Sequence, residues 1–393
     1  MTNTDTATRA NTLTATDYAL FRETARRFAE QEIKPHIEKW EKAGIVPLEW
    51  WRRAGEAGLL CVEIADTYGG AGGDFRSASL VIEEIMRAGA GGLGSSISVH
   101  SDIVGMYVNN QGTESQKQTW LPKMVRGEVV GAIAMSEPDA GSDLQSMRTT
   151  ARRDGDAYVL NGQKTFITNG KNARLCIVCA KTDASAGARG ISLFLVDTTL
   201  PGYQTGRNLE KVGQHMSDTS EIFLDDVRVP ADSLLGAENQ GFSILMSELP
   251  RERLLLAIGG IAAAEAAIEW TVDYTSQRKV FGKPISEFQN TRFTLAQLKA
   301  EVTIGRTFVE NCTDSLMRGE LDATTAAMAK LWLSQLQSRV ADACLQLHGG
   351  YGYMTEFPIS RAWTDARVQQ IYGGSNEVMK EIIARGIFGK LPS

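Results

Sequence analysis

Residues that bind metals or form disulfides are scarce in this sequence. The 393-residue chain has five cysteines and four histidines, and an odd number of cysteines suits a reducing compartment better than a disulfide framework. Cys176 and Cys179 of "LCIVCAK" lie in an apolar run typical of a β-strand, and no second pair or nearby histidine completes a metal site. The histidines show no metal-ligand spacing either. We therefore expect no metal site, and we interpret the cysteine pair as packing.

Clusters of basic residues and long apolar runs are also missing. The net charge of −6 and the pI near 5.5 argue against a nucleic-acid-binding surface. No run of about eighteen apolar residues predicts a membrane span, and the threonine-rich start, "MTNTDTATRANTLTATDY", lacks the apolar core of a signal peptide. We therefore expect a cytoplasmic protein with a frayed start, no nucleic-acid partner and no stable membrane insertion.

Familiar nucleotide-binding signatures are absent, because the chain has no G-x-G-x-x-G after a strand pattern and no P-loop. The pattern that the chain does show changes twice. Helical spacing dominates residues 17–127, short β-like runs fill residues 131–236, and long helical segments return from residue 241. A chain of this length is expected to form about two or three domains. We predict an α+β multidomain fold with a helical domain (1–130), a β domain (131–240) and a second helical domain (241–393).

Three kinds of segment have the composition of a cofactor site. The small residues of "AMSEPDAGSDLQS" leave backbone N–H groups and the Ser142 hydroxyl free to approach a flat ring or a phosphate, although a strand followed by a Pro-Asp turn explains the segment equally well. In "TFITNG", Phe166 and Thr168 share one face of a strand, so one can cover a ring while the other bonds to its edge. Two further segments, "QRKVFGKPISEFQ" and "LQLHGGYGY", supply side chains suited to a pyrophosphate and an adenine, but Arg and Gln at helix ends usually face solvent.

Glu252 lies between two arginines in "SELPRERLLLAIGG", just before a long apolar run. Pro250 fits the first turn of a helix, and a carboxylate in that turn meets the positive end of the helix dipole. In this interpretation Glu252 is a capping charge, and Arg251 and Arg253 are its solvated neighbours. The alternative is a catalytic role, which only the rest of the chain can support.

Taken together, these segments resemble the acyl-CoA dehydrogenases, flavoenzymes that oxidise acyl-CoA thioesters to trans-2-enoyl-CoA. The resemblance extends from Asp17 to Lys390 and rests on "AMSEPDAGSD", "FITNG", "RKVFGKPISEFQ", "LQLHGGYGY" and "IYGGSNEVMKE" in the order and spacing typical of the family. It implies an N-terminal helical domain, a middle β-barrel-like domain and a C-terminal four-helix-bundle domain. It also implies FAD between the middle and C-terminal domains, reaching a neighbouring subunit, and a homotetramer built as a dimer of dimers.

The resemblance implies a set of site residues as well. Those expected against the flavin ring and its phosphates are Ile133, Met135, Ser136, Ser142, Phe166 and Thr168. Those expected at the adenosine end of FAD and near "YGGSNE" are Arg278, Phe281, Gln289, Gln346, Gly350, Ser375 and Glu377. Those expected to contact the substrate are Ser142, Arg253, Ser95, Val99 and Gly374. Many family members have tryptophan where this chain has Phe166.

The base that removes the substrate α-proton is not at its usual place. In most family members this carboxylate follows the Ile-Tyr pair of the C-terminal motif, where this chain has Gly373. The long-chain and isovaleryl-CoA dehydrogenases instead place it on the first turn of the helix before "RKxFG", a position that corresponds to Glu252. The resemblance therefore implies Glu252 as the base, with the backbone N–H of Gly373 directed at the thioester oxygen.

The long-chain branch of the family is the most similar in detail, in "SISVHSDIV", "GAIAMSEP", "ELPRERLL" and "YGGSNEVMKE". Small residues at Ser95, Ser96, Ser98 and Val99 lie where the acyl tail is expected to end, and they either leave a deep channel or let helices pack closely. A branched or terpenoid chain, of isovaleryl or citronellyl type, is an alternative substrate. A catalytically silent flavin-fold binding or assembly protein is an alternative of another class. We expect an electron-transfer flavoprotein as electron acceptor, whereas an oxidase would use oxygen.

Overall fold

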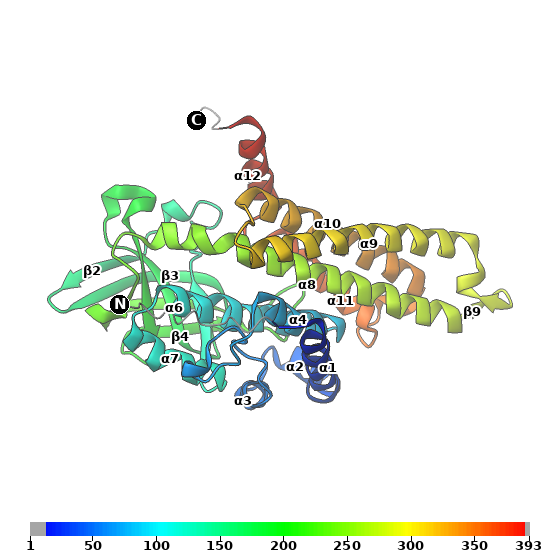
Figure 1. The fold of residues 1–393 in the computed structure, drawn as a ribbon, viewed down its shortest axis with the longest axis horizontal. Coiled ribbons are helices and arrows are strands. Elements are labelled where there is room, and N and C mark those ends of the chain that lie inside the picture. The colour runs from blue at the N-terminus through cyan, green and yellow to red at the C-terminus, as the bar shows by residue number, and fades with distance from the viewer. Residues whose placement is uncertain (1–12, 390–393) are drawn as a thin grey trace, which may run out of the picture.

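The computed structural model describes residues 13–389; residues 1–12, where a frayed start is expected, and residues 390–393 lie outside the described part. Helices come first along the chain, a sheet follows, and long helices complete it (Figure 1). The sheet lies at one end of the elongated molecule, and helices α8, α9 and α10 run along the rest of its length. The predicted fold class is confirmed.

The N-terminal helices begin at the polar caps that their sequences provide. Thr14 and Asp17 form a capping box at the start of α1, and Thr113 and Gln116 form another at the start of α7. The α-helices here are α1 (Ala15–Glu32), α2 (Ile37–Ala43), α3 (Leu48–Glu56), α4 (Phe75–Arg87), α5 (Gly91–Ile97), α6 (Gly105–Gln111) and α7 (Glu114–Val125). Between α5 and α6 the chain forms a π-helix, η3 (Ser98–Val104), a rare conformation that is frequent at functional sites.

Eight strands form one sheet in the order β6-β7-β3-β2-β4-β5-β8, with β1 pairing with β4. The strands are β1 (Val130–Ala134), β2 (Thr150–Asp154), β3 (Ala157–Thr168), β4 (Ala173–Lys181), β5 (Ile191–Asp197), β6 (Tyr203–Asn208), β7 (Thr219–Pro230) and β8 (Leu234–Leu235). Along β4, Cys176 and Cys179 contribute to two different core clusters, as expected for opposite faces of a sheet. Both are buried and free, which agrees with the packing interpretation.

The C-terminal helices are α8 (Gly241–Gln277), α9 (Gln289–Met317), α10 (Ala323–His348), α11 (Pro358–Ala366) and α12 (Asn376–Phe388). A two-stranded hairpin, β9 (Lys279–Val280) and β10 (Lys283–Pro284), follows α8 at the far tip of the molecule (Figure 1). The 37 residues of α8 extend over about 55 Å. This helix is long and apolar enough to cross a membrane, but 72% of its most apolar window is buried inside the protein, as in a core helix.

Candidate active site

Glu252 lies in the interior of α8, not at its start. The helix begins at Gly241 and continues through Pro250, so Glu252 is about three turns from the N-terminus. The prediction that it occupies a first helical turn is therefore wrong. Because the dipole effect falls off within one turn, a capping role does not explain this glutamate. Glu252 is also only 7% exposed, and a buried carboxylate needs a partner or a function.

Among the described residues, the one side chain that bonds to the Glu252 carboxylate comes from another helix. The Tyr107 hydroxyl on α6 donates a hydrogen bond to Glu252 Oε1 at 2.9 Å, and both groups are buried. Burial raises the pKa of Glu252 to about 7, although the hydrogen bond from Tyr107 opposes this shift. A carboxyl with a pKa near neutrality is suited to general base catalysis.

Of the two arginines beside Glu252, Arg253 is buried and Arg251 is largely covered, so the expectation that they are solvated is wrong. Arg251 forms an ion pair with Glu63 and lies over the ring of Phe75. Arg253 is only 5% exposed, and burial lowers its pKa. Within residues 13–389, neither arginine forms an ion pair with Glu252. The carboxylate is therefore not neutralised by a salt bridge and keeps its capacity to accept a proton.

A glycine turn lies against the same stretch of α8. Gly373 and Gly374 both have positive φ, +64° and +89°, a conformation that glycine adopts at low cost. A Cβ at position 373 would clash with Leu256 Cδ1, one helical turn after Glu252. A glutamate at position 373 would therefore require both backbone strain and movement of the Leu256 side chain.

Lys330 anchors the glycine turn through hydrogen bonds. Its ammonium group, on α10, is buried and donates to the Gly374 carbonyl at 2.7 Å and to Asn376 Oδ1 at 3.0 Å. Burial lowers the pKa of Lys330 to about 8. The turn is thus fixed by a buried cation, so the backbone N–H of Gly373 has a defined direction.

The two segments predicted to hold a flavin lie side by side. The Thr165 N–H donates to the Ser136 carbonyl at 3.0 Å, which joins the end of β1 to β3. A register shift in β3 between Lys164 and Ile167 carries Phe166 outward, so that its ring is 71% exposed at a φ of +59°. A non-glycine residue with positive φ and an exposed aromatic ring requires a reason. A flat ligand stacked on Phe166 would provide it, so the residues present fit a flavin ring.

A buried ion pair connects the two segments predicted to hold a flavin. Lys164 donates to Glu137 Oε1 at 2.8 Å and to the Met135 carbonyl at 3.2 Å, and its side chain is fully buried. Glu137 also accepts hydrogen bonds from the backbone N–H groups of Arg148 and Thr149. The Glu137 carboxylate therefore links the two ends of the loop between β1 and β2, and this loop includes the exposed Ser142.

The remaining flavin and substrate candidates are distributed around this opening. Ile133, Met135 and Val99 are half-buried and pack against the core cluster that contains Tyr107. Ser95 Oγ lies 3.1 Å from the hydroxyl of Tyr372, the residue before the glycine turn. The structure thus brings Ser95, Val99 and the end of β1 to the region of Glu252. Thr168, at the end of β3, is half-buried.

Two of the serines expected at the end of the acyl tail are buried, and one of them is hydrogen-bonded to another part of the chain. Ser96 and Ser98 are 2% and 8% exposed, and Ser96 Oγ bonds to Ser217 Oγ at 2.9 Å. Ser375 is likewise occupied locally, because its hydroxyl caps α12 by accepting from the Val378 N–H. Glu377 is exposed beside Lys380.

The residues predicted for an adenosine end lie at the other end of α8. Arg278, Gln346 and Gly350 line a surface groove of about 480 Å³, and the Arg278 guanidinium lies over the ring of Tyr351. Phe281, at the tip of the hairpin, is 95% exposed with a φ of +50°. Gln289 is exposed at the start of α9. These groups suit an adenine and a pyrophosphate.

The two halves of the candidate cofactor site are far apart within one chain. Gln277, the last residue of α8, lies about 38 Å along the helix axis from Glu252, and Arg278 follows it directly. One dinucleotide cannot reach from Phe166 to Arg278 of the same chain. If both groups hold the same molecule, they come from two different subunits.

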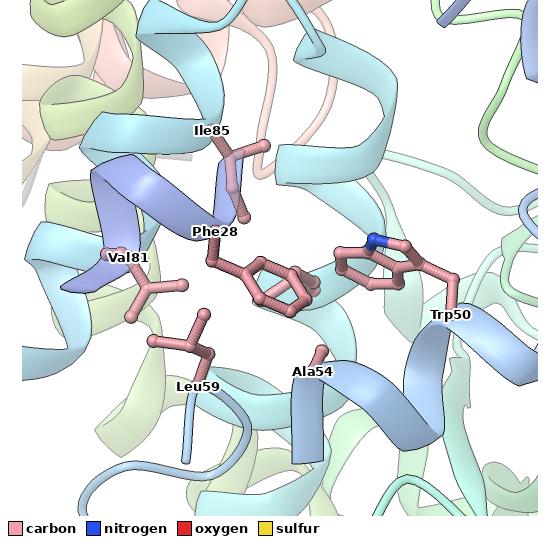
Figure 2. Close-up of a pocket in the computed structure, with 8 residues that line it drawn as sticks. Phe28, Trp50, Ala54, Leu59, Val81 and Ile85 are labelled. Atoms are coloured by element: carbon pink, nitrogen blue, oxygen red, sulfur yellow. The ribbon is translucent and has the colours of Figure 1, made fainter. Parts of the chain in front are cut away.

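A second gap in the molecule has no side chains suited to catalysis or to polar ligand binding. It lies among the N-terminal helices, and Figure 2 shows its lining by Phe28, Trp50, Leu59, Val81 and Ile85. The lining is apolar, and the gap has no room for a water molecule. It is a packing defect and not a binding site.

Sequence reasoning missed Tyr107, Lys330 and Lys164. Tyr107 lies in a helical segment, where an aromatic residue reads as core. A single sequence does not distinguish a buried lysine from a solvent-facing one, because burial depends on elements that are distant in the chain. No pattern in the chain marks these three residues.

Comparisons with known proteins match the chain over most of its length. Family models match it as acyl-CoA dehydrogenase N-terminal domain (residues 16–128), middle domain (132–227) and C-terminal domain (239–388). A long-chain specific acyl-CoA dehydrogenase, mitochondrial, from Sus scrofa is 49% identical over 95% of this chain and 87% of the relative. An isovaleryl-CoA dehydrogenase, mitochondrial, from Solanum tuberosum is 36% identical over 94% and 90%.

Solved structures agree with these matches. An acyl-CoA dehydrogenase from Geobacillus kaustophilus has a TM-score of 0.93 and 47% identity, covering 96% of this chain and 99% of that chain. A glutaryl-CoA dehydrogenase from Mycobacterium smegmatis in complex with FADH2 has a TM-score of 0.90 and 32% identity, covering 97% and 96%.

Proposed function

The chain belongs to the acyl-CoA dehydrogenase family, and from that premise we propose that it dehydrogenates a long-chain or bulky acyl-CoA with Glu252 as the base. It is an oxidoreductase that acts on acyl-CoA and depends on FAD. The observation that carries the assignment of Glu252 is a buried carboxylate that has no ion-pair partner within residues 13–389 and lies one helical turn before Leu256, which contacts the Gly373 turn.

The reaction removes one proton and one hydride from the substrate. FAD, when bound, supplies the acceptor for the hydride from the β-carbon. Glu252 takes the α-proton: the α-carbon–hydrogen bond breaks, an O–H bond forms on the carboxylate, and the neutral acid that results is tolerated in its buried site. Because Glu252 must be ionised to act and its pKa is about 7, the rate of proton removal rises with pH through neutrality and levels off about one pH unit above this pKa.

The backbone N–H of Gly373 is proposed to stabilise the negative charge that develops on the thioester oxygen. A donor that is fixed before the reaction contributes more than one that must reorganise. The bonds from Lys330 to the Gly374 carbonyl and to Asn376 provide this fixed geometry. Lys330 itself points at the protein backbone and acts through the turn. Arg253 and Gly374 lie next to the proposed path of the thioester.

Glu252, Phe166 and Ser136 are the residues proposed to orient the reactants. Phe166 offers an exposed face to the ring, while Ile133, Met135 and Thr168 border it. The Ser142 hydroxyl is exposed on the loop between β1 and β2, where it can reach a phosphate or the thioester arm. Together these groups hold ring and substrate in line, so that proton and hydride leave opposite sides of one carbon–carbon bond.

A long acyl chain is the substrate that the relatives favour. The identity to the long-chain specific relative is 49%, against 36% for the isovaleryl relative. Ser95 and Val99 are half-buried and one helical turn apart, and a small side chain at position 95, which contacts the Tyr372 hydroxyl, is compatible with the proposed long chain. A branched or terpenoid chain remains the second candidate, since both branches of the family have the same base position.

We predict that long-chain or bulky acyl-CoAs are oxidised with higher kcat/KM than butyryl-CoA. Each buried methylene group contributes about 0.8 kcal/mol of binding, provided that the channel accepts it. The measurement is a panel of acyl-CoAs of graded length and branching, assayed with an artificial electron acceptor. A clear preference for butyryl-CoA would reject this substrate class.

We also propose that FAD is shared between subunits of a homotetramer, built as a dimer of dimers. The separation of the Phe166 and Arg278 groups supports sharing, because β3, which carries Phe166, lies in the sheet at one end of the molecule and Arg278 follows α8 near the opposite tip (Figure 1). An electron-transfer flavoprotein is the proposed electron acceptor, and a cytoplasmic location stays a prediction. A silent assembly protein is disfavoured, since it would have no use for a buried, unpaired carboxylate.

Replacing Arg278 with alanine is expected to weaken FAD retention. The guanidinium can form charge-assisted bonds to a pyrophosphate, and such bonds are worth about 1.5–3 kcal/mol, so the flavin should dissociate roughly tenfold or more faster. The measurement is flavin occupancy after dilution and gel filtration, with Arg318→Ala as the matched control, because Arg318 pairs only with a nearby surface glutamate. Unchanged occupancy in Arg278→Ala would remove this residue from the site.

A further inference from the structure

Two hydrogen bonds join α6 to α8 at the candidate base. Tyr107 donates to Glu252 Oε1 at 2.9 Å, and one turn further along α6, Asn110 donates to Glu248 Oε1 at 3.1 Å. Glu248 and Glu252 are themselves one turn apart on α8. The two helices therefore meet along two matched donor–carboxylate pairs, of which only the Tyr107 pair is fully buried.

The contact with Tyr107 gives the two oxygens of the Glu252 carboxylate different environments. Oε1 accepts the phenol hydrogen, whereas no donor within residues 13–389 reaches Oε2. One oxygen is thus anchored and the other is free to receive a proton. A carboxylate held in this way has a defined orientation, which proton transfer from carbon requires.

We propose that Tyr107 is a positioning residue for the reaction: its hydroxyl fixes the Glu252 carboxylate with Oε2 toward the substrate and stabilises the ionised form. The proposal rests on the proposed role of Glu252 as base. A hydrogen bond to the charged form of an acid favours that form. Tyr107 thereby keeps a buried base ionised at a pH where burial alone would protonate it.

The other charged groups around Glu252 do not perform this task. On α8, Glu248 raises its pKa, and Arg253 and Arg251 lower it, but neither arginine bonds to the carboxylate. On β4, the Cys179 thiol has a pKa raised by burial to about 12 and stays neutral. Tyr107, on α6, also keeps its proton, because burial raises its pKa well above the usual value. The phenol is therefore a permanent donor.

The Tyr107→Phe variant tests the proposal because it removes one hydroxyl and keeps the ring. We expect the pH at half-maximal flavin reduction to move upward by roughly one to two units, with normal flavin content. Below that pH the rate should fall roughly ten- to a hundredfold. Tyr158→Phe is the matched control, since Tyr158 is a buried tyrosine that donates to Glu238 Oε2 at 2.9 Å within the sheet domain. Its profile should overlay that of the unmodified enzyme.

A second measurement needs no turnover. The infrared band of the protonated Glu252 carboxyl, identified by its loss in Glu252→Gln, gives the midpoint of titration in the holoenzyme. This midpoint should rise in Tyr107→Phe. With 3-fluorotyrosine at position 107, whose phenol donates more strongly, the midpoint should fall, and this variant keeps all the packing.

The outcomes separate the two proposals. If the infrared midpoint is the same in all three proteins, Tyr107 does not stabilise the ionised carboxylate and the inference is wrong. If the midpoint moves but the pH profile of flavin reduction does not, Glu252 is not the base, and the proposed function fails together with the positioning role.

Discussion

Glutamine in place of Glu252 is expected to slow flavin reduction by at least roughly a hundredfold, within the range for loss of a general base. Glutamine keeps the size of the side chain and can still accept the bond from Tyr107, so folding and binding of FAD and acyl-CoA should be nearly unchanged. Only the capacity to take the α-proton is lost. Rapid mixing of the protein with acyl-CoA without oxygen measures the rate directly, as the bleaching of flavin absorbance.

Glu248→Gln provides the control for this result. Glu248 lies one turn before Glu252 on the same helix, is nearly buried and also accepts a hydrogen bond from α6. Its removal eliminates the same charge without touching the base, and the bleaching rate should stay within about tenfold of the unmodified rate. Equal loss in both variants would show that the negative charge of this helix, and not one base, is what matters.

Methionine in place of Lys164 is expected to destabilise the protein by about 3–5 kcal/mol, because it leaves the buried Glu137 carboxylate without its cation. The Lys164 side chain is fully buried, and it also bonds to the Met135 carbonyl. The loss should appear as unfolding and flavin release at lower denaturant concentration. The control is Lys380→Met, since Lys380 is an exposed lysine at 4.0 Å from Glu377 and such pairs contribute little.

The double variant Lys164→Met with Glu137→Gln separates charge from packing. It removes the stranded charge, so it should be more stable than Lys164→Met alone. Equal stability of the single and double variants would show that the ion pair is not what holds the loop.

Acid should weaken the same ion pair, between Lys164 and Glu137. Burial acts to raise the pKa of Glu137, but Lys164 and the backbone N–H of Arg148 outweigh it, so its pKa lies below the ordinary value of 4.5. A carboxyl with a lowered pKa in the folded state contributes stability above its unfolded pKa, and this contribution is lost as the pH falls through the folded value. Lys164→Met should therefore lose much of this pH dependence below about pH 4.5.

Local patterns were sufficient to predict the fold class. Alternating short runs mark the strands, and the polar caps Thr14 and Thr113 lie where helices begin, because periodicity and capping are properties of neighbouring residues. The motif around Phe166 was recognised for the same reason: residues two apart on a strand share a face. Its outward turn, however, depends on a register shift against β7, which no local pattern reveals.

The environment of Glu252 could not be read from the chain. Pro250 indicated a helix start, but α8 continues through it, because the packing of a buried helix offsets the cost of one interior proline. Tyr107 is far from Glu252 in sequence, and their contact exists only once α6 packs on α8. The proposed base followed from a family resemblance, whereas the contact between Leu256 and the Gly373 turn became visible only in the structure.

Hydrogen exchange at the substrate α-carbon tests the role of Glu252 most directly. An acyl-CoA with no hydrogen on its β-carbon cannot be oxidised, so any reaction in deuterated water stops at removal of the α-proton and return of a deuteron. Mass spectrometry of the recovered thioester counts the exchange. We predict deuterium at the α-carbon with the unmodified holoenzyme and with Glu248→Gln, and at least roughly a hundredfold slower incorporation with Glu252→Gln. Incorporation at the unmodified rate in Glu252→Gln would mean that another group removes the proton.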